Sequence, residues 1–131
     1  MQNVNQVLNT QNDISIREPF KNEIEIRSNS YNSVAFLTMK SDSAHLDDLL
    51  RGDGPKGMGS VLLNQVCSEA RQRGAKLITG SITRAVISDG ISRGFSCDAN
   101  GRPSGLIKFY EKHGFTVTPD GKGTYTIKKY L

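Results

Sequence analysis

A glycine-rich segment marks the point where the chain changes from strand-like to helical periodicity. It reads Gly54-Pro55-Lys56-Gly57-Met58-Gly59-Ser60-Val61-Leu62-Leu63. Glycine lets the backbone approach a bound group that a Cβ would exclude. The first turn of a helix also presents unpaired N–H groups and the positive end of its dipole. The segment therefore predicts a phosphate cradle built from Lys56, Gly57, Met58, Gly59 and Ser60.

The length of the chain, 131 residues, predicts one domain over 1–131, with 1–13 as a flexible arm. No apolar run approaches the roughly 18 residues of a membrane span. The Asn/Gln-rich start does not resemble a secretory signal. Cys67 and Cys97 form no CxxC motif, and no histidine pair accompanies them, so no metal site is predicted. A cytoplasmic protein is expected.

Charge divides unevenly along the chain. Residues 1–53 carry 5 basic and 8 acidic side chains, whereas residues 54–131 carry 12 basic and 5 acidic ones. The basic half begins at the glycine-rich segment, which suits a polyanionic ligand. A nucleic-acid-binding domain would show a similar charge, so this alternative stays open.

Hydrophobic patterning predicts an α/β fold with few helices. Strands are expected at 14–16, 22–27, 34–40 and 45–50, then a helix from Met58 to the region of Arg71–Gly74. A strand at 76–83, a loop at 84–103, a helix at 106–113 capped by Ser104, a strand at 115–118 and a strand at 124–130 complete the order.

Two motifs carry a resemblance to a known family. Gly57 and Gly59, followed by Leu62-Leu63, match a Gln/Arg-x-x-Gly-x-Gly/Ala loop. The segment 109–115, Phe-Tyr-Glu-Lys-His-Gly-Phe, looks like a Phe/Leu-Tyr-Glu-Lys-x-Gly-Phe element. The chain thereby resembles the GNAT superfamily of acyl-CoA N-acyltransferases. It departs from the pattern at Gly54, where the family has a basic residue, and at Pro55, where glycine is common.

The resemblance implies an α/β (α+β) fold. Its central sheet would be mixed and mostly antiparallel, with a V-shaped splay between the strands before and after the main helix. It also implies a leading strand and two N-terminal helices, for which this sequence leaves little room. In the family those helices often build the acceptor side.

The same resemblance implies an enzyme that moves an acetyl group from acetyl-CoA to a primary amine, by direct attack in a ternary complex. Tyr110 would be the general acid for the leaving thiolate, and Asp47 the position of an acidic residue that helps deprotonate the amine. The strand containing Leu49 and Leu50 would donate a backbone N–H to the thioester carbonyl. Lys108 and Lys112, with Arg102, could meet the adenosine phosphates of coenzyme A.

Each assignment has a structural alternative. Tyr110 could pack its helix on the sheet, and Asp47 could be a solvated strand end. Asp47 and Asp48 are adjacent, so on a regular strand they point to opposite faces. His45 is a second candidate for the base.

Other functions remain open. A non-catalytic acyl-CoA-binding or regulatory module would share the cradle. The acceptor could be a small molecule, a protein or an aminoacyl-tRNA. Open sheet edges could also be completed in a homodimer.

Overall fold

The computed structural model describes residues 13–50, 52 and 54–131. The chain divides into two compact units: Met1–Ile78 together with Leu131, and Thr79–Tyr130.

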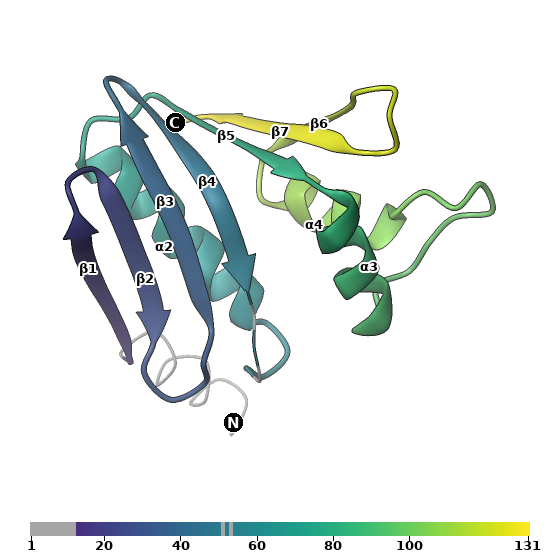
Figure 1. Cartoon of the computed structure of the whole chain (residues 1–131), viewed down its shortest axis with the longest axis horizontal. Coiled ribbons are helices and arrows are strands. Elements are labelled where there is room, and N and C mark those ends of the chain that lie inside the picture. The colour runs from purple at the N-terminus through teal and green to yellow at the C-terminus, as the bar shows by residue number, and fades with distance from the viewer. Residues whose placement is uncertain (1–12, 51, 53) are drawn as a thin grey trace. The chain divides into compact units, whose positions relative to one another are not determined.

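The first unit is an antiparallel meander backed by one helix (Figure 1). The strands β1 (Ile14–Phe20), β2 (Glu23–Ser28), β3 (Val34–Lys40) and β4 (Ser43–Leu50) pair in chain order. The helix α2 (Met58–Gln72) follows.

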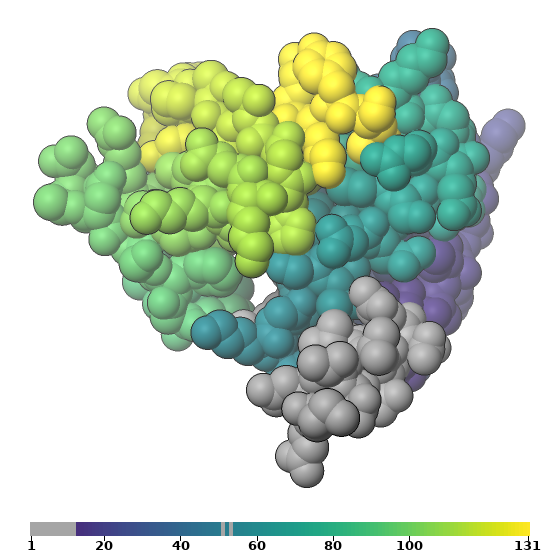
Figure 2. Space-filling view, turned by 180° about the vertical axis from the view of Figure 1, so that it is seen from behind, coloured from purple at the N-terminus to yellow at the C-terminus, as the bar shows by residue number. Residues whose placement is uncertain are grey.

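The core of the first unit lies between α2 and one face of these strands. Ile24 pairs with Leu37 and Leu37 with Leu46, so the three side chains share a face, and all are buried. The helix meets them with a helical stripe of buried side chains that includes Leu62 and Val66. The space-filling view from behind shows the teal surface of α2 on this side (Figure 2).

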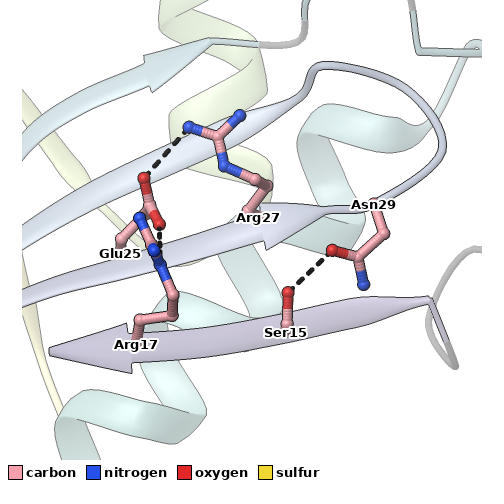
Figure 3. A network of polar contacts seen from close by, with 5 residues as sticks. All are labelled: Ser15, Arg17, Glu25, Arg27 and Asn29. Carbon is pink, nitrogen blue, oxygen red and sulfur yellow. Dashed lines mark hydrogen bonds and ion pairs between the residues drawn. The ribbon is translucent and has the colours of Figure 1, made fainter. Parts of the chain in front are cut away.

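The opposite face of β1–β3, which we call the far face, carries a polar network on β1 and β2. There the carboxylate of Glu25 accepts from Arg17 Nε at 2.6 Å and from Arg27 Nη2 at 3.0 Å (Figure 3). Ser15 donates to Asn29 Oδ1 nearby. Glu25 is only 5% exposed, so its burial depends on the two guanidinium partners.

A two-residue turn joins β1 to β2. Phe20 pairs with Glu23, and Asn22 adopts the left-handed conformation with φ of 68°. Asparagine tolerates this region better than most residues. The leading strand for which the sequence left little room is therefore present, and no helix lies between it and β2.

The second unit is smaller and contains two helices. The strand β5 (Leu77–Ile82) begins in the first unit and leads into it. The helices α3 (Arg84–Ser92) and α4 (Ser104–Lys112) come next, followed by β6 (Thr116–Pro119) and β7 (Tyr125–Tyr130). The strand β7 lies between β5 and β6, and β6 pairs with it antiparallel.

Two predictions in this unit were wrong. Residues 84–92, expected in a loop, form α3, whose first turn is capped by Thr83 Oγ1 accepting from the Val86 N–H at 3.3 Å. Ser104 does not cap α4, because Pro103 occupies the N-cap position and the Ser104 hydroxyl donates to Ser96 O instead.

The fold class predicted from the sequence is confirmed as α/β with a mostly antiparallel sheet. The single domain and the splay between β4 and β5 stay predictions. The predicted arm lies outside the described residues except for Asp13. That carboxylate accepts from the backbone N–H of Ser30 at 2.7 Å and from Ser28 Oγ at 3.1 Å. None of the helices that the structure describes is long and apolar enough to cross a membrane.

Candidate functional site

The start of α2 has the geometry of an anion cradle. Gly57 occupies the N-cap position with φ of 98°, and no side chain caps the first turn. A Cβ built on Gly57 would meet no atom of the described residues within 4 Å, so space lies beside this part of the loop. Since a helix N-terminus attracts negative charge, this opening suits a phosphate group.

The neighbouring residues of the loop differ in their roles. Met58 N–H donates to Pro55 O at 3.0 Å, and the Met58 side chain is buried. Met58 therefore closes and anchors the turn. Lys56 and Gly57 are exposed, whereas Gly59 and Ser60 in the first helical turn are half-buried.

Gly54 explains the departure from the family pattern at the entrance of the loop. A Cβ at this position would lie 2.7 Å from Met58 Cγ and 2.7 Å from Ser33 Oγ. Such contacts are too short for any side chain without a shift of the neighbours. The basic residue of the family pattern has no room here, and Lys56 is the loop's own cation.

A bulge in β4 rearranges the two adjacent carboxylates. Leu46 pairs with Leu37, and Asp48 pairs with Phe36, so Asp47 is an extra residue without a partner across the ladder. Because Phe36 and Leu37 point to opposite faces of β3, Asp48 and Leu46 do so too. Asp47 and Asp48 consequently share the far face. The prediction that they point to opposite faces was wrong because it assumed unbroken alternation.

Asp47 is held by side chains of the same face. Thr38 Oγ1 donates to Asp47 Oδ2 at 2.5 Å, and His45 Nε2 lies 4.0 Å from Asp47 Oδ1. The Asp47 carboxylate remains exposed to solvent. A carboxylate that is oriented by a hydroxyl, lies beside an imidazole and is open to water can receive a proton. The sequence singled out Asp47 and His45 but not Thr38, whose position depends on strand pairing.

Leu49 and Leu50 lie just beyond the bulge, at the end of β4. They pair with Ala35 and Val34 respectively. In an antiparallel ladder, successive residues direct their N–H groups alternately toward and away from the partner strand. One of these two N–H groups therefore points away from β3, as a donor to a carbonyl oxygen requires.

Tyr110 lies on α4 in the second unit, within an aromatic cluster. Its ring packs edge-on against Phe109 at 5.2 Å and Phe115 at 5.7 Å between centroids. Burial raises the pKa of Tyr110 to about 12. Its hydroxyl has no hydrogen-bond partner among the described residues. Buried hydroxyls are normally paired, so this one is a group with unused donor capacity.

Lys112 is exposed in the last turn of α4. The pKa of the next residue, His113, is lowered mainly by burial. The positive charges of Lys112 and Lys129 lower it further. Lys129 Nζ donates to His113 O at 2.8 Å and so is tied to the helix end. The Lys112 ammonium has no such partner among the described residues.

The predicted site residues thus fall into two groups. Asp47, Leu49 and Leu50 lie on β4, and the residues Lys56 to Ser60 lie at the start of α2, all in the first unit. Tyr110 and Lys112 lie together on α4 of the second unit.

Comparison with known proteins identifies the fold. No family model matches the chain, and no curated protein matches its sequence. Solved structures do match. The PaiA N-acetyltransferase of Thermoplasma acidophilum, in complex with coenzyme A, has a TM-score of 0.58 at 17% identity, over 99% of this chain and 70% of that one.

Two further structures agree with it. A GNAT family acetyltransferase of Elizabethkingia anophelis with acetyl-CoA bound has a TM-score of 0.57 at 13% identity, covering 99% of this chain and 82% of that one. The GNAT domain of S. lividans PAT has a TM-score of 0.61 at 15% identity, covering 88% of this chain and 64% of that one. The chain has the fold of the GNAT acetyltransferases, and the resemblance read from the sequence is confirmed at the level of the fold.

Proposed function

We propose that this protein transfers an acetyl group from acetyl-CoA to a primary amine. The observation that carries the proposal is the open, left-handed N-cap at Gly57, in a chain with the fold of acetyltransferases that bind coenzyme A. A glycine in that conformation, with free space where its Cβ would be, fits the close approach of a pyrophosphate.

The loop residues divide the binding of coenzyme A between them. Gly59 and Ser60 present the N–H groups of the first helical turn to the pyrophosphate. Lys56 adds a positive charge that replaces the basic residue of the family pattern, for which there is no room at Gly54. Lys112 contributes a second cation from α4. Bound acetyl-CoA supplies an activated thioester, and a backbone N–H of Leu49 or Leu50 polarises its carbonyl.

Direct transfer requires two proton movements. The attacking amine must lose a proton, and Asp47 accepts it, through a water molecule or by way of His45. The new amide bond forms as the carbon–sulfur bond breaks. The Tyr110 hydroxyl then gives its proton to the departing thiolate and regains one from solvent. A pKa of about 12 keeps this hydroxyl protonated at neutral pH.

The test combines binding and turnover. Titration calorimetry with acetyl-CoA measures affinity, and thiol release with a panel of amines measures transfer, with mass spectrometry of the products. The panel contains polyamines, amino sugars, lysine peptides and aminoacyl-tRNA. We expect saturable binding and acetylated product with at least one amine. A folded protein that does not bind acetyl-CoA would overturn the proposal.

A non-catalytic acyl-CoA-binding module is the second candidate. The two-residue turn between Phe20 and Glu23 favours it, because the helices that often build the acceptor side in this family do not follow β1. This candidate predicts acetyl-CoA binding without thiol release across the whole panel. It also predicts that Tyr110→Phe changes no function.

The proposal includes a cytoplasmic location and a homodimer. Neither Cys67 nor Cys97 forms a disulfide with a described residue, which suits a reducing cytoplasm. The strand β1 lies at an edge of the strand order, and pairing of this edge with a second copy would give a homodimer. Size-exclusion chromatography with light scattering tests that assembly.

A further inference from the structure

A cleft lies within the second unit, and neither Tyr110 nor Lys112 lines it. Its volume is about 400 Å³. One wall is α3, a second is the loop before α4, and the third is the connection from β6 to β7. The lining residues are Arg84, Ile87, Ser88, Ile91, Asn100, Gly101, Arg102, Pro103, Gly123 and Tyr125.

The wall formed by α3 is one continuous stripe of that helix. Arg84, Ile87, Ser88 and Ile91 follow the spacing i, i+3, i+4 and i+7, which places them on a single helical face. Such a face normally packs into a core. Here Gly90 is the only buried residue of α3, and Ile91 is 49% exposed. The stripe thus presents apolar surface to the cleft.

Two arginines give the cleft its charge. Arg84 Nη2 donates to Lys122 O at 3.0 Å, which fixes the guanidinium beside Gly123. No carboxylate of the described residues forms an ion pair with Arg84 or Arg102. Both guanidinium groups therefore keep donors for an anion.

Two acidic side chains of the loops around the cleft are engaged by the backbone. Asp98 Oδ1 accepts from the N–H groups of Asn100 and Arg102, both at 2.9 Å. Asp120 Oδ1 accepts from the N–H of Lys122 at 2.8 Å. These carboxylates shape the loops that carry the cleft, and they do not neutralise its arginines.

We propose that this cleft binds a small organic anion, with a carboxylate or phosphate group on a flat apolar body. The anionic group would meet Arg84 and Arg102, because guanidinium matches planar and tetrahedral oxyanions with paired hydrogen bonds. The apolar body would cover Ile87 and Ile91 and lie against Tyr125. A volume of about 400 Å³ is that of a small-molecule pocket. This site is additional to acetyl transfer and does not depend on it.

The experiment is an NMR titration of the full chain, following backbone amide shifts. The probes are benzoate and phenyl phosphate, with benzamide as the uncharged counterpart. We expect saturable shifts at Ile87, Ile91, Gly101 and Gly123 with both anions, and at least tenfold weaker binding of benzamide. No saturable shift at these residues up to 20-fold excess over roughly millimolar protein would overturn the proposal.

Matched variants locate the anion. Arg102→Gln removes a guanidinium that forms no hydrogen bond or ion pair with the described residues, so we expect a tenfold or greater loss of benzoate affinity with unchanged thermal unfolding. Arg93→Gln is the control, since Arg93 pairs with Asp89 and does not line the cleft. Equal affinity in wild type and Arg102→Gln would refute the assignment.

A competition experiment with coenzyme A tests whether the anion bound in the cleft is a separate ligand or the 3′-phosphate of coenzyme A. A separate site predicts that saturating acetyl-CoA leaves benzoate affinity unchanged within twofold. Competitive displacement of benzoate by coenzyme A, but not by 3′-dephospho-coenzyme A, would assign the cleft to the 3′-phosphate of the acyl donor and overturn the proposal of a separate ligand.

Discussion

Thr38 Oγ1 on β3 donates a 2.5 Å hydrogen bond to Asp47 Oδ2 on the bulge of β4. This contact orients the carboxylate on the far face. If Asp47 accepts the proton of the amine, Asp47→Asn lowers kcat/KM by about 100-fold, because the amide cannot accept it. Thr38→Val leaves the carboxylate but loosens it, with a loss of about tenfold. Thiol release with the preferred amine measures both.

The control is Asp48→Asn, which alters a carboxylate on the same face without the contact to Thr38. We expect less than a threefold change. All three variants should keep the free energy of unfolding to within about 1 kcal/mol, since these side chains are not in the core. An Asp47→Asn variant as active as wild type would exclude the carboxylate as base and transfer that role to His45.

Gly57 and Gly74 have similar φ angles, so substituting each of them distinguishes an effect on stability from an effect on binding. Gly57 has φ of 98° and Gly74 has φ of 91°, and a Cβ on either meets nothing within 4 Å. Alanine at each position should cost about 1–2 kcal/mol of unfolding free energy, from the left-handed conformation alone. Only Gly57→Ala should also weaken acetyl-CoA binding.

Urea denaturation and calorimetry measure the two quantities. The comparison is internal, because both substitutions carry the same conformational cost at opposite ends of α2. Equal affinities for acetyl-CoA in Gly57→Ala and Gly74→Ala would contradict the placement of the pyrophosphate at Gly57.

Glu25 makes stability depend on pH. The hydrogen bonds from Arg17 and then Arg27 hold its pKa below its ordinary value of 4.5. A carboxyl group with a lowered pKa in the folded state stabilises the fold above its unfolded pKa. That contribution is lost as the pH falls through the lower, folded-state pKa. Glu25→Gln should therefore flatten the decline of stability below about pH 4.5.

At neutral pH the same variant should lose about 1–2 kcal/mol, a modest value because both guanidinium groups reach solvent. Urea unfolding from pH 3 to 7 provides the measurement. Glu23→Gln, an exposed residue of the same strand, is the control. An unaltered pH dependence in Glu25→Gln would rule out this carboxylate as a source of acid sensitivity.

Tyr110→Phe tests the proposed acid. Its hydroxyl has no hydrogen-bond partner among the described residues, so its removal should leave the unfolding free energy equal or slightly higher. The rate of transfer should fall by about 100-fold if the hydroxyl protonates the thiolate. Because the pKa is raised to about 12, wild-type kcat should show no loss from tyrosine ionisation below about pH 11.

Tyr130→Phe serves as the matched control, since this side chain is highly exposed. Acetyl-CoA affinity should be unchanged in both variants. Full activity in Tyr110→Phe would remove the assignment of the acid. Absence of thiol release from the wild type with every amine would instead support the non-catalytic module.

The elements with strong local periodicity could be predicted from the sequence. The strand expected at 34–40 coincides with β3, and the helix expected from Met58 begins there. Both present several apolar side chains in a regular pattern to one core. The glycine turn at the start of α2 was also predictable, because glycine spacing and the following helical pattern are both local. The binding of phosphate there stays a prediction.

Features that depend on contacts distant in sequence were not predictable. The helix α3 has few apolar residues, and polar residues surround them in the sequence, so its periodicity did not indicate a helix. In the structure its only buried residue is Gly90. The bulge at Asp47 is defined only by pairing with Phe36 and Leu37. The contact of Thr38 with Asp47 likewise depends on the pairing of β3 with β4. Thr83 was the one local signal of α3, as an N-cap residue.

The extra residue in β4 changes the far face and leaves the core face as it is. Leu46 and Leu49 are three positions apart, yet their partners Leu37 and Ala35 place them on the same, helix-facing side. Deletion of Asp47 or Asp48 would restore simple alternation and leave Leu46 and Leu49 two positions apart, still on the same side. The core would therefore tolerate the loss of this residue, and the loss would remove one of the two carboxylates from the far face.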